Sequence, residues 1–478
     1  MFQLHNVLHY PLGLLLYFLC CSSAVSYAQS THPVLKDAFG RTLLLHGLNT
    51  SSSAKHSTDN HPWIGEEDVQ REQTEFGFNS VRYLIFWGAI EPEQDMYNDS
   101  YLAEVKKRVE WYTNRKMYVI LDMHQDIYGF GVGGNGAPAW ASTQTKIQNI
   151  IPDKWAWWLQ NLEPKVKKSY VTFFKYKKRK ELQDHYMLAW KKVIEVFKDN
   201  PYVIGYDVMN EPHGGKVIRT LSGKFEKKEL HAFYKRVIGS IRTADTTRYI
   251  FFEPRSFGVN FGMKSHLPKV EDAIPSGTNK LVYAPHLYLA FVDIGGNYSK
   301  KYQKKLVKWY RNRLREAAMH QTPILIGEFG LSPGKKDFDK YLQDIFKRAN
   351  QHNVSWSYWS SDLGGWGPFK SDKTPSPIMN EIVAVYPHAT AGLLKNFEYD
   401  KHQNIFQLAY VSDSSIAAPT EIIIPKFLFP NGYDFQLTGL ENWRQEFDST
   451  SQTLKIYTNE GGKEVAVFIK PKSAQNDM

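Results

Sequence analysis

Cysteine is nearly absent from this 478-residue chain, which contains only Cys20 and Cys21. Both lie in the apolar run Pro11–Cys21, which is followed by small residues up to Ala28. This arrangement is typical of a secretory signal peptide cleaved after Ala28. Removal of residues 1–28 would leave no cysteine, which excludes disulfide bonds and thiol catalysis. We therefore expect a secreted protein, located in the extracellular space or in a periplasm.

The sequence also lacks the motifs that bind phosphates and nucleic acids. Its glycine-rich stretch Gly129–Gly136 matches neither GxGxxG nor GxxxxGK[ST]. The net charge of +10 would allow attraction to nucleic acid or to an anionic membrane, but no nucleic-acid-binding signature accompanies it. The N-terminal apolar run is shorter than a membrane span requires. We expect a generally basic protein with no nucleic-acid partner.

Eight apolar runs alternate with charged segments of helical spacing from residue 42 onward. Runs without polar alternation are typical of strands that are buried on both faces of a parallel sheet. Eight such runs separated by helices predict an α/β fold of the TIM-barrel type, (β/α)8. The runs are Thr42–Asn49, Ser80–Trp87, Tyr118–Gln125, Val203–Pro212, Tyr249–Arg255, Leu281–Tyr288, Pro323–Gly330 and Ser355–Asp362.

The pattern of residue types changes after Tyr386. From there on, short β-rich runs are separated by turn residues. This change predicts a catalytic barrel over residues 31–386 and a small C-terminal all-β sandwich domain over residues 387–478. We expect the sandwich to support the barrel rather than to act as an independent sugar-binding module. A long insertion, about residues 126–200, separates the third and fourth runs, and a loop of this length beside a barrel mouth is usually functional.

Two glutamates stand at the C-terminal ends of apolar runs, the face on which barrel enzymes carry their active sites. Glu211 ends the fourth run and Glu328 ends the seventh. Cleavage of a glycosidic bond needs two carboxyl groups, one to protonate the leaving oxygen and one to attack the anomeric carbon or activate water. An ion pair with a nearby Arg or Lys would explain either glutamate alone. Two of them on one face favour catalysis.

The motifs around these glutamates, NEP at Asn210–Pro212 and GEFG at Gly327–Gly330, resemble glycoside hydrolase family 5 across all eight runs. The resemblance implies that Glu211 is the acid/base and Glu328 the nucleophile of a retaining mechanism. Other family active-site positions are occupied by Arg82, His124, Asn210, His286, Tyr288 and Trp359. Further segments are similar to endoglycoceramidases and their relatives: Ser53–Lys55, Asp122–Gly129, Asn135–Ala141, Pro285–Tyr288 and Tyr386–Gly392.

The chemistry assigns a role to most of these side chains. We expect a partly apolar site and the neighbouring Glu328 charge to keep Glu211 protonated. Arg82 and Tyr288 should keep Glu328 ionised, and Asn210 should hydrogen-bond the sugar 2-hydroxyl in the transition state.

The remaining candidates belong to the first sugar subsite, where we expect Trp359 to form the floor. Lys55, His124 and Asp126 should bind hydroxyls of that sugar, although a structural ion pair or a core histidine explains each of them nearly as well. His124 and Asp126 lack a third ligand at metal-binding spacing, and the chemistry needs no metal. We therefore expect neither a metal nor a cofactor.

The resemblance implies a glycosphingolipid substrate, cleaved at the β-glycosidic bond between glycan and ceramide. We also expect a monomer that contacts a membrane surface transiently through the basic run Lys165–Lys180, unless that run is simply a solvated helix face. Aromatic side chains of the insertion would then line an apolar channel for the lipid: Trp155, Trp157, Trp158, Phe173, Phe174 and Tyr176.

Two alternatives stay open at this stage. The first is another family 5 activity, either a β-glucosylceramidase or a polysaccharide endo-glucanase or mannanase with an open cleft. The second is a catalytically inactive barrel that only binds carbohydrate. The presence of both Glu211 and Glu328 with their supporting residues argues against the inactive barrel.

Overall fold

The computed structural model describes residues 32–143, 157–177, 179–289, 292 and 296–472. The predicted signal peptide, residues 1–28, lies outside the described residues and stays a prediction. None of the helices formed by the described residues combines the length and the hydrophobicity that a membrane span requires.

The eight predicted runs all contribute strands to one parallel sheet, which confirms the predicted barrel. The strand order is β7-β6-β5-β4-β3-β2-β9-β8. A parallel bridge from Tyr283 in β7 to Ile324, just before β8, brings the two edges together. The strands are β2 (His46–Asn49), β3 (Ser80–Ile85), β4 (Tyr118–Met123), β5 (Val203–Asp207), β6 (Tyr249–Phe252), β7 (Leu281–Tyr283), β8 (Leu325–Ile326) and β9 (Ser355–Tyr358).

The interior of the barrel is apolar at one end and charged at the other. Ile120 and Asp122 lie two residues apart on β4 and therefore face the same side of the sheet. Ile120 belongs to a buried cluster with Ile204 and Phe251, whereas Asp122 lies closer to the C-terminal end and contacts Arg82. The apolar cluster fills the N-terminal part of the barrel, so the charges gather at the face where active sites form.

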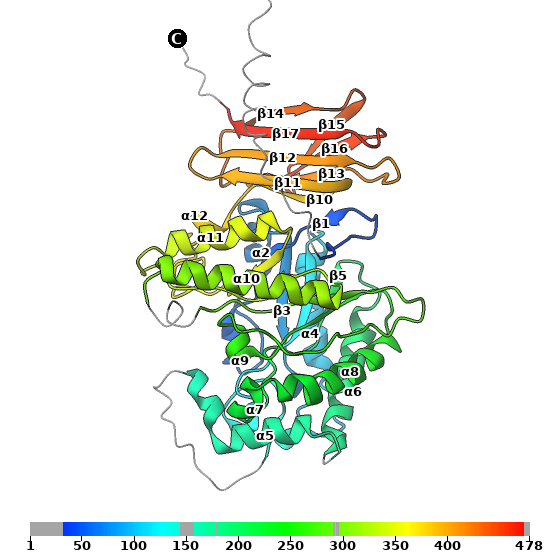
Figure 1. Cartoon of the computed structure of the whole chain (residues 1–478), viewed down its shortest axis with the longest axis vertical. Helices are drawn as coiled ribbons and strands as arrows, with labels where there is room; N and C mark the ends of the chain where they lie inside the picture. The colour runs from blue at the N-terminus through cyan, green and yellow to red at the C-terminus, as the bar shows by residue number, and fades with distance from the viewer. Residues whose placement is uncertain (1–31, 144–156, 178, 290–291, 293–295, 473–478) are drawn as a thin grey trace, which may run out of the picture. The chain divides into compact units, whose positions relative to one another are not determined.

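Helices cover the outside of the barrel, as Figure 1 shows for α4, α6, α8 and α10. At the start of α4, the Asn98 side chain caps the helix by accepting a hydrogen bond from the Tyr101 N–H. These helices are α2 (Glu66–Thr74), α3 (Trp87–Ile90), α4 (Asp99–Thr113), α6 (Lys180–Phe197), α8 (His231–Arg242), α10 (Lys300–His320), α11 (Phe338–Gln351) and α12 (Met379–Ile382).

Short helices occupy the loops between the strands and the covering helices. Some of them follow the C-terminal ends of strands and therefore flank the charged end of the barrel. They are η1 (Ser52–Lys55), η2 (Phe130–Val132), η3 (Ala139–Ala141), η4 (Trp157–Leu162), α5 (Pro164–Phe174), α7 (Val217–Leu221), η5 (Glu226–Leu230) and α9 (Ser256–Val259).

The C-terminal residues form two antiparallel sheets around their own core, as predicted. The sheet orders are β1-β10-β13-β16-β15 and β11-β12-β17-β14. The strands are β10 (Tyr386–Thr390), β11 (Gly392–Asp400), β12 (Ile405–Ser412), β13 (Thr420–Ile423), β14 (Tyr433–Thr438), β15 (Trp443–Asp448), β16 (Thr453–Thr458) and β17 (Glu464–Pro471). The β-rich runs expected here were Ile405–Val411, Glu421–Phe429, Phe435–Leu437, Leu454–Tyr457 and Glu464–Ile469, so β10, β11 and β15 were not predicted.

One predicted run divides between the two parts of the fold. Thr42–Asn49 was expected to be a single barrel strand, but Thr42–Leu43 forms β1, which pairs antiparallel with β10. Only His46–Asn49 enters the barrel. Both halves are apolar and buried, so hydrophobicity could not separate them.

Of the aromatic side chains expected to line a channel in the insertion, Phe173, Phe174 and Tyr176 are described, and Phe174 lines the groove between α5 and α7. Phe173 and Phe174 are 2% and 4% exposed and pack into the core, with the Phe173 ring 5.5 Å from that of Tyr186. Tyr176 lies under the guanidinium of Arg236. The inward stripe of the amphipathic helix α5 accounts for the two phenylalanines. Of the tryptophans, Trp155 and the side chains of Trp157 and Trp158 lie outside the described residues.

Candidate active site

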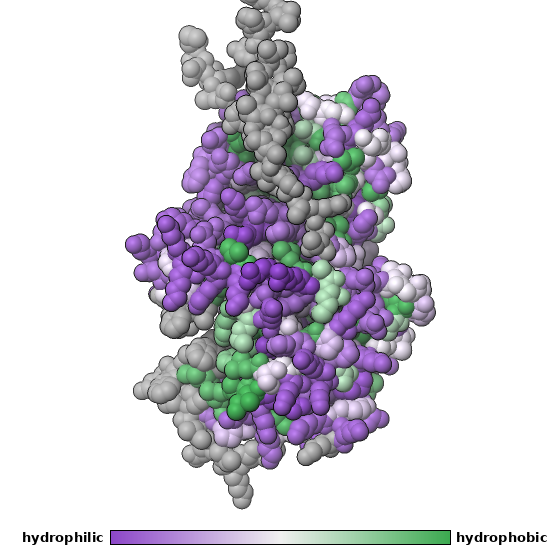
Figure 2. Space-filling model, in the orientation of Figure 1, coloured by the Kyte–Doolittle hydropathy of each residue, from purple (hydrophilic) through white to green (hydrophobic). Residues whose placement is uncertain are grey.

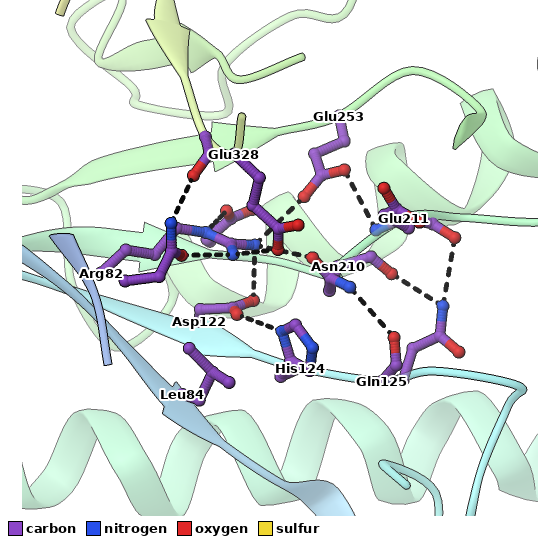
Figure 3. A network of polar contacts seen from close by, with 12 residues as sticks. Arg82, Leu84, Asp122, His124, Gln125, Asn210, Glu211, Glu253 and Glu328 are labelled. Atoms are coloured by element: carbon purple, nitrogen blue, oxygen red, sulfur yellow. Dashed lines mark hydrogen bonds and ion pairs between the residues drawn. The ribbon is translucent and has the colours of Figure 1, made fainter. Parts of the chain in front are cut away.

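Arg82 on β3 is the centre of the polar network at the C-terminal end of the barrel (Figure 3). Its fully buried guanidinium lies 2.8 Å from Glu328, 2.9 Å from Asp207, 3.0 Å from Asp122 and 3.3 Å from Glu253. A buried cation is tolerated only when it is paired and hydrogen-bonded, and several partners also fix its orientation. Arg82 therefore holds Glu328 in one position.

Glu328, just beyond β8, is bound through both carboxylate oxygens. Arg82 Nη1 donates to Oε1 at 2.8 Å, and the Tyr288 hydroxyl donates to Oε2 at 2.9 Å. Only 5% of the residue is exposed. Hydrogen bonds donated to a carboxylate favour its ionised form. The structure thus brings the predicted nucleophile together with both of its predicted partners.

Glu211, just beyond β5, lies opposite Glu328 and has a separate set of partners. Its Oε1 accepts a hydrogen bond from Asn260 Nδ2 at 2.7 Å and lies 2.9 Å from His286 Nδ1. Its backbone N–H donates to Glu253 Oε2 at 3.0 Å (Figure 3). The backbone φ of Glu211 is 44°, a left-handed conformation that is uncommon outside glycine and that these contacts hold.

The two glutamates are close to each other. One carboxylate oxygen of Glu211, one of Glu328 and a nitrogen of His286 all lie within 4.8 Å of one another. Carboxyl groups of retaining glycosidases are about 5–5.5 Å apart, whereas inverting enzymes need about 6.5–9.5 Å to admit a water molecule. Oxygens within 4.8 Å of each other fit the shorter of these separations, that of covalent catalysis.

His286 lies between the two glutamates. Its Nδ1 is 2.9 Å from Glu211 Oε1 and 3.4 Å from Glu328 Oε2, and its Nε2 is 3.1 Å from Glu253 Oε1. Burial by itself lowers the pKa of the imidazole, but the charges of Glu253 and Glu328 outweigh it and raise this pKa well above its usual value. These charges favour the imidazolium form of His286, which faces both catalytic carboxyl groups.

The predicted sugar-binding residues form a second cluster. Lys55 Nζ lies 2.6 Å from Asp126 Oδ2 and 4.0 Å from the centroid of the Trp359 ring. His124 stacks on Trp359 with ring centroids 5.5 Å apart, and its Nε2 lies 3.4 Å from Asp126. Burial raises the pKa of Asp126, but Lys55 and His124 lower it well below its usual range. The cluster offers charged hydrogen-bonding groups beside a half-buried indole, which suits a sugar ring.

Asn210 is tied into the network at both ends of its amide. Its Oδ1 accepts from Arg82 Nη2 at 2.9 Å, and its Nδ2 donates to the Gln125 carbonyl at 3.0 Å. An amide nitrogen carries two hydrogens, so one remains for a substrate hydroxyl.

Several residues of the network were not predicted from the sequence, among them Asp122, Asp207, Glu253 and Asn260. Asp122, Asp207 and Glu253 each stand within or directly after an apolar strand, which is the same signal that identified the two catalytic glutamates. Asn260 follows α9 in a loop and has no comparable signal.

Family comparisons agree with this geometry. The Cellulase model, described as glycosyl hydrolase family 5, matches residues 37–364. The glycoside hydrolase family 5 C-terminal domain matches residues 385–469.

Individual proteins are similar over nearly the whole chain. Endoglycoceramidase I from Rhodococcus hoagii (strain 103S) is 27% identical over 431 residues, covering 86% of this chain and 82% of its own. Endo-glycoceramidase II from Rhodococcus sp., solved as a ganglioside GM3 complex, is 34% identical with a TM-score of 0.85, covering 92% of this chain and 100% of its own. The same enzyme, solved as a lactosyl-enzyme intermediate, is 34% identical with a TM-score of 0.84 and the same coverage.

Proposed function

Because the chain belongs to glycoside hydrolase family 5, we propose that it cleaves the β-glycosidic bond between the glycan and the ceramide of glycosphingolipids. The observation that carries this proposal is the likeness, across 92% of the chain, to an enzyme solved with ganglioside GM3 and as a lactosyl-enzyme. The chain is a retaining glycoside hydrolase, and the close pair of Glu211 and Glu328 supports assigning them the two catalytic roles.

In the first step Glu328 attacks the anomeric carbon while Glu211 gives its proton to the glycosidic oxygen. The bond between the anomeric carbon and that oxygen breaks, ceramide leaves with the proton, and an ester joins the glycan to Glu328. Arg82 and Tyr288 orient the attacking carboxylate, because each of them donates to one of its oxygens.

In the second step the ionised Glu211 takes a proton from water, whose oxygen attacks the anomeric carbon. The ester bond breaks, Glu328 returns as a carboxylate, and the glycan leaves with its original anomeric configuration. His286 faces both glutamates, so it stays close to the negative charge when that charge moves from Glu328 to Glu211.

A surface close to Glu211 supports a lipid aglycone. Asn260 contacts Glu211, while its neighbours Phe261 and Met263 are 40% and 42% exposed. Ile218 of α7 is 85% exposed. Figure 2 shows hydrophobic side chains gathered where α7 and α9 lie in Figure 1. We call Ile218, Leu221, Phe257, Phe261 and Met263 the α7–α9 apolar surface. The acid/base sits on the leaving-group side of the bond, so this surface would receive the ceramide.

Basic side chains lie beside the α7–α9 apolar surface. A groove of about 840 Å³ between α5 and α7 is lined by apolar side chains, by one carboxylate, Glu229, and by five basic residues. We propose that this groove contacts an anionic membrane surface transiently, because basic groups near such a surface each contribute about 1 kcal/mol. The basic residues are Lys167, Lys175, Lys216, Arg219 and Lys224.

The proposed function is tested by incubating the enzyme with a panel of glycosphingolipids and scoring both products. Intact oligosaccharide together with free ceramide is the expected result for substrates with several sugars. Glu328→Gln serves as the matched inactive control, because it removes the nucleophile without changing the size of the side chain.

Other outcomes would identify the alternatives. Release of glucose from glucosylceramide alone would identify a β-glucosylceramidase. Activity on glucan or mannan fragments without any ceramide release would overturn the glycolipid assignment.

We also propose that the protein is secreted. The support is the apolar run before Ala28 and the small residues that follow it. Amino-terminal sequencing of the exported protein should then begin at Gln29, and a protein that retains residues 1–28 inside the cell would contradict secretion.

A further inference from the structure

The loop after β6 brings an amide into direct contact with Glu211. Asn260 Nδ2 donates to Glu211 Oε1 at 2.7 Å, and only 5% of Asn260 is exposed. A hydrogen bond donated to a charged carboxylate is stronger than most neutral hydrogen bonds. The contact is therefore strong enough to affect what Glu211 does.

The backbone around Asn260 is built for this position. The α9 segment departs from helical geometry at Phe257 and Gly258. Gly258 has a φ of +90°, and a Cβ there would lie 2.8 Å from Met263 Sδ, so the turn requires glycine. The Asn260 carbonyl accepts a hydrogen bond from the Tyr288 N–H at 3.1 Å, which ties the loop to the residue that also binds Glu328.

Buried side chains of α10 hold the same loop from outside. Arg313, which is fully buried, donates to the carbonyls of Val259 at 2.9 Å and Met263 at 2.6 Å. Asn312 Nδ2 donates to the Gly262 carbonyl at 3.0 Å. A loop fixed at three carbonyls places its side chains accurately, so Asn260 is pre-organised against Glu211.

Two side chains contact the same oxygen of Glu211, Oε1. Asn260 and the imidazolium of His286 both face Oε1. A carboxyl oxygen that accepts two hydrogen bonds is the poorer site for the acid proton, which leaves Oε2 to carry it.

We propose that Asn260 is a positioning residue that keeps Oε1 of Glu211 as an acceptor and aims the proton on Oε2 at the glycosidic oxygen. The inference rests on the proposed role of Glu211 as acid/base. When the proton passes from Oε2 to the leaving oxygen, the bond from that oxygen to the anomeric carbon breaks and the bond to Glu328 forms. Glu211 is then a carboxylate, and the donors on Oε1 stabilise it without moving.

The test uses aryl glycosides whose leaving groups range from nitrophenol, which departs without a proton, to phenol, which needs one. Asn260→Ala removes the donor, and Asn260→Asp removes it while keeping the size of the side chain. We expect kcat/KM to fall about 10- to 100-fold for the poor leaving groups and less than about three-fold for nitrophenol. Asn260→Asp should be at least as impaired as Asn260→Ala, because a second carboxylate would face Glu211.

A purely structural role predicts a different pattern. It would lower activity equally for all leaving groups, and the smaller Asn260→Ala would be the worse variant; either result overturns the inference. Thermal midpoints of both variants are measured in parallel. Asn260→Asp keeps the size of the side chain, so it still tests the inference if Asn260→Ala does not fold.

Glu211→Gln separates failure of the inference from failure of the proposed function. If Glu211→Gln shows the leaving-group dependence and the Asn260 variants do not, only the positioning role is wrong. If Glu211→Gln loses activity equally on every substrate, the acid/base assignment itself fails. Lys264→Ala, an exposed change on the same segment, is the matched control and should behave as the wild type.

Discussion

The two catalytic glutamates have different environments, and the difference predicts different mutant phenotypes. Glu328 accepts hydrogen bonds from Arg82 and Tyr288, and Glu328→Gln should abolish turnover of every substrate, because no ester can form. Glu211→Gln should still form the glycosyl-enzyme from a nitrophenyl glycoside, whose leaving group needs no proton. Stopped-flow release of nitrophenol should then show a burst followed by slow turnover.

A small anionic nucleophile provides the control for this prediction. Azide needs no general base, so it should accelerate turnover by Glu211→Gln and give a product of retained configuration. It should not rescue Glu328→Gln. Equal activities of the two variants on the nitrophenyl substrate would contradict the division of roles.

Glu72 on α2 predicts a dependence of stability on pH. It is 1% exposed, and burial raises its pKa to about 7, although the Ser361 hydroxyl donates to it at 2.7 Å. In the unfolded chain this pKa is about 4.3, so between these values the folded state keeps a proton that the unfolded state loses. The free energy of unfolding should therefore fall by about 4 kcal/mol as the pH rises through this window.

Glu72→Gln cannot ionise and should escape that loss. Its thermal midpoint should exceed that of the wild type at pH 8, and the difference should shrink towards pH 5. Glu67→Gln, an exposed change on the same helix, should give the same small difference at both pH values. A Glu72→Gln midpoint that stays at or below that of the wild type at pH 8 would contradict the prediction.

Individual site residues were predictable from the sequence where a carboxylate falls at the end of an apolar strand. Glu211 and Glu328 interrupt apolar runs at the C-terminal ends of strands, and a carboxylate at that position indicates a functional group. The same rule would have identified Glu253, which follows the run YIFF of β6. Asn260 reaches the site only through the bent backbone at Gly258, and this geometry is invisible in the sequence.

At the level of elements, the strands of the barrel were predictable, whereas β10, β11 and β15 of the C-terminal sheets were not. All residues of β3 are buried, and all but Ser80 and Arg82 are apolar, whereas β15 has no buried residue and therefore no such pattern. β1 is buried too, but its partner is β10 rather than a barrel strand. Hydrophobicity reports burial, and it does not report which strand pairs with which.

The groove between α5 and α7 predicts that activity depends on how the substrate is presented. If its cations contact an anionic bilayer, removing them should weaken binding to vesicles without touching the catalytic groups. We expect about a 10- to 100-fold loss on glycolipid in anionic vesicles, and little change on a soluble aryl glycoside. Four lysines are changed to glutamine together: Lys167, Lys175, Lys216 and Lys224.

A charge-matched variant controls for the change in net charge. It carries four lysine-to-glutamine changes on α4, on α6 and just after α6, and it should keep its activity on vesicles. These residues are Lys106, Lys107, Lys191 and Lys198. Equal losses in both variants, or activity of the groove variant that survives on vesicles, would show that the cations of the groove only face solvent.

In the molecule as a whole, the two parts of the fold share structure at several points. β1, which precedes the first barrel strand, belongs to a C-terminal sheet. The Tyr386 hydroxyl donates to the Gly77 carbonyl at 2.9 Å, and the Phe427 N–H donates to the Glu75 carbonyl at 2.9 Å. The Phe76 and Phe427 rings are 5.5 Å apart. The end of α2 thus relies on C-terminal residues for packing and hydrogen bonds.

A chain truncated after residue 386 should therefore be less stable than the full chain, even though every candidate catalytic residue remains. Leu44 and Val385 belong to the C-terminal core and would become exposed, and β1 would lose its only strand partner among the described residues. We expect a lower thermal midpoint and stronger binding of a hydrophobic dye, with kcat per folded molecule nearly unchanged. A chain shortened only to residue 472 is the control. If the truncated barrel melts at the same temperature as the control, the C-terminal sheets do not support the barrel, and another role would have to explain them.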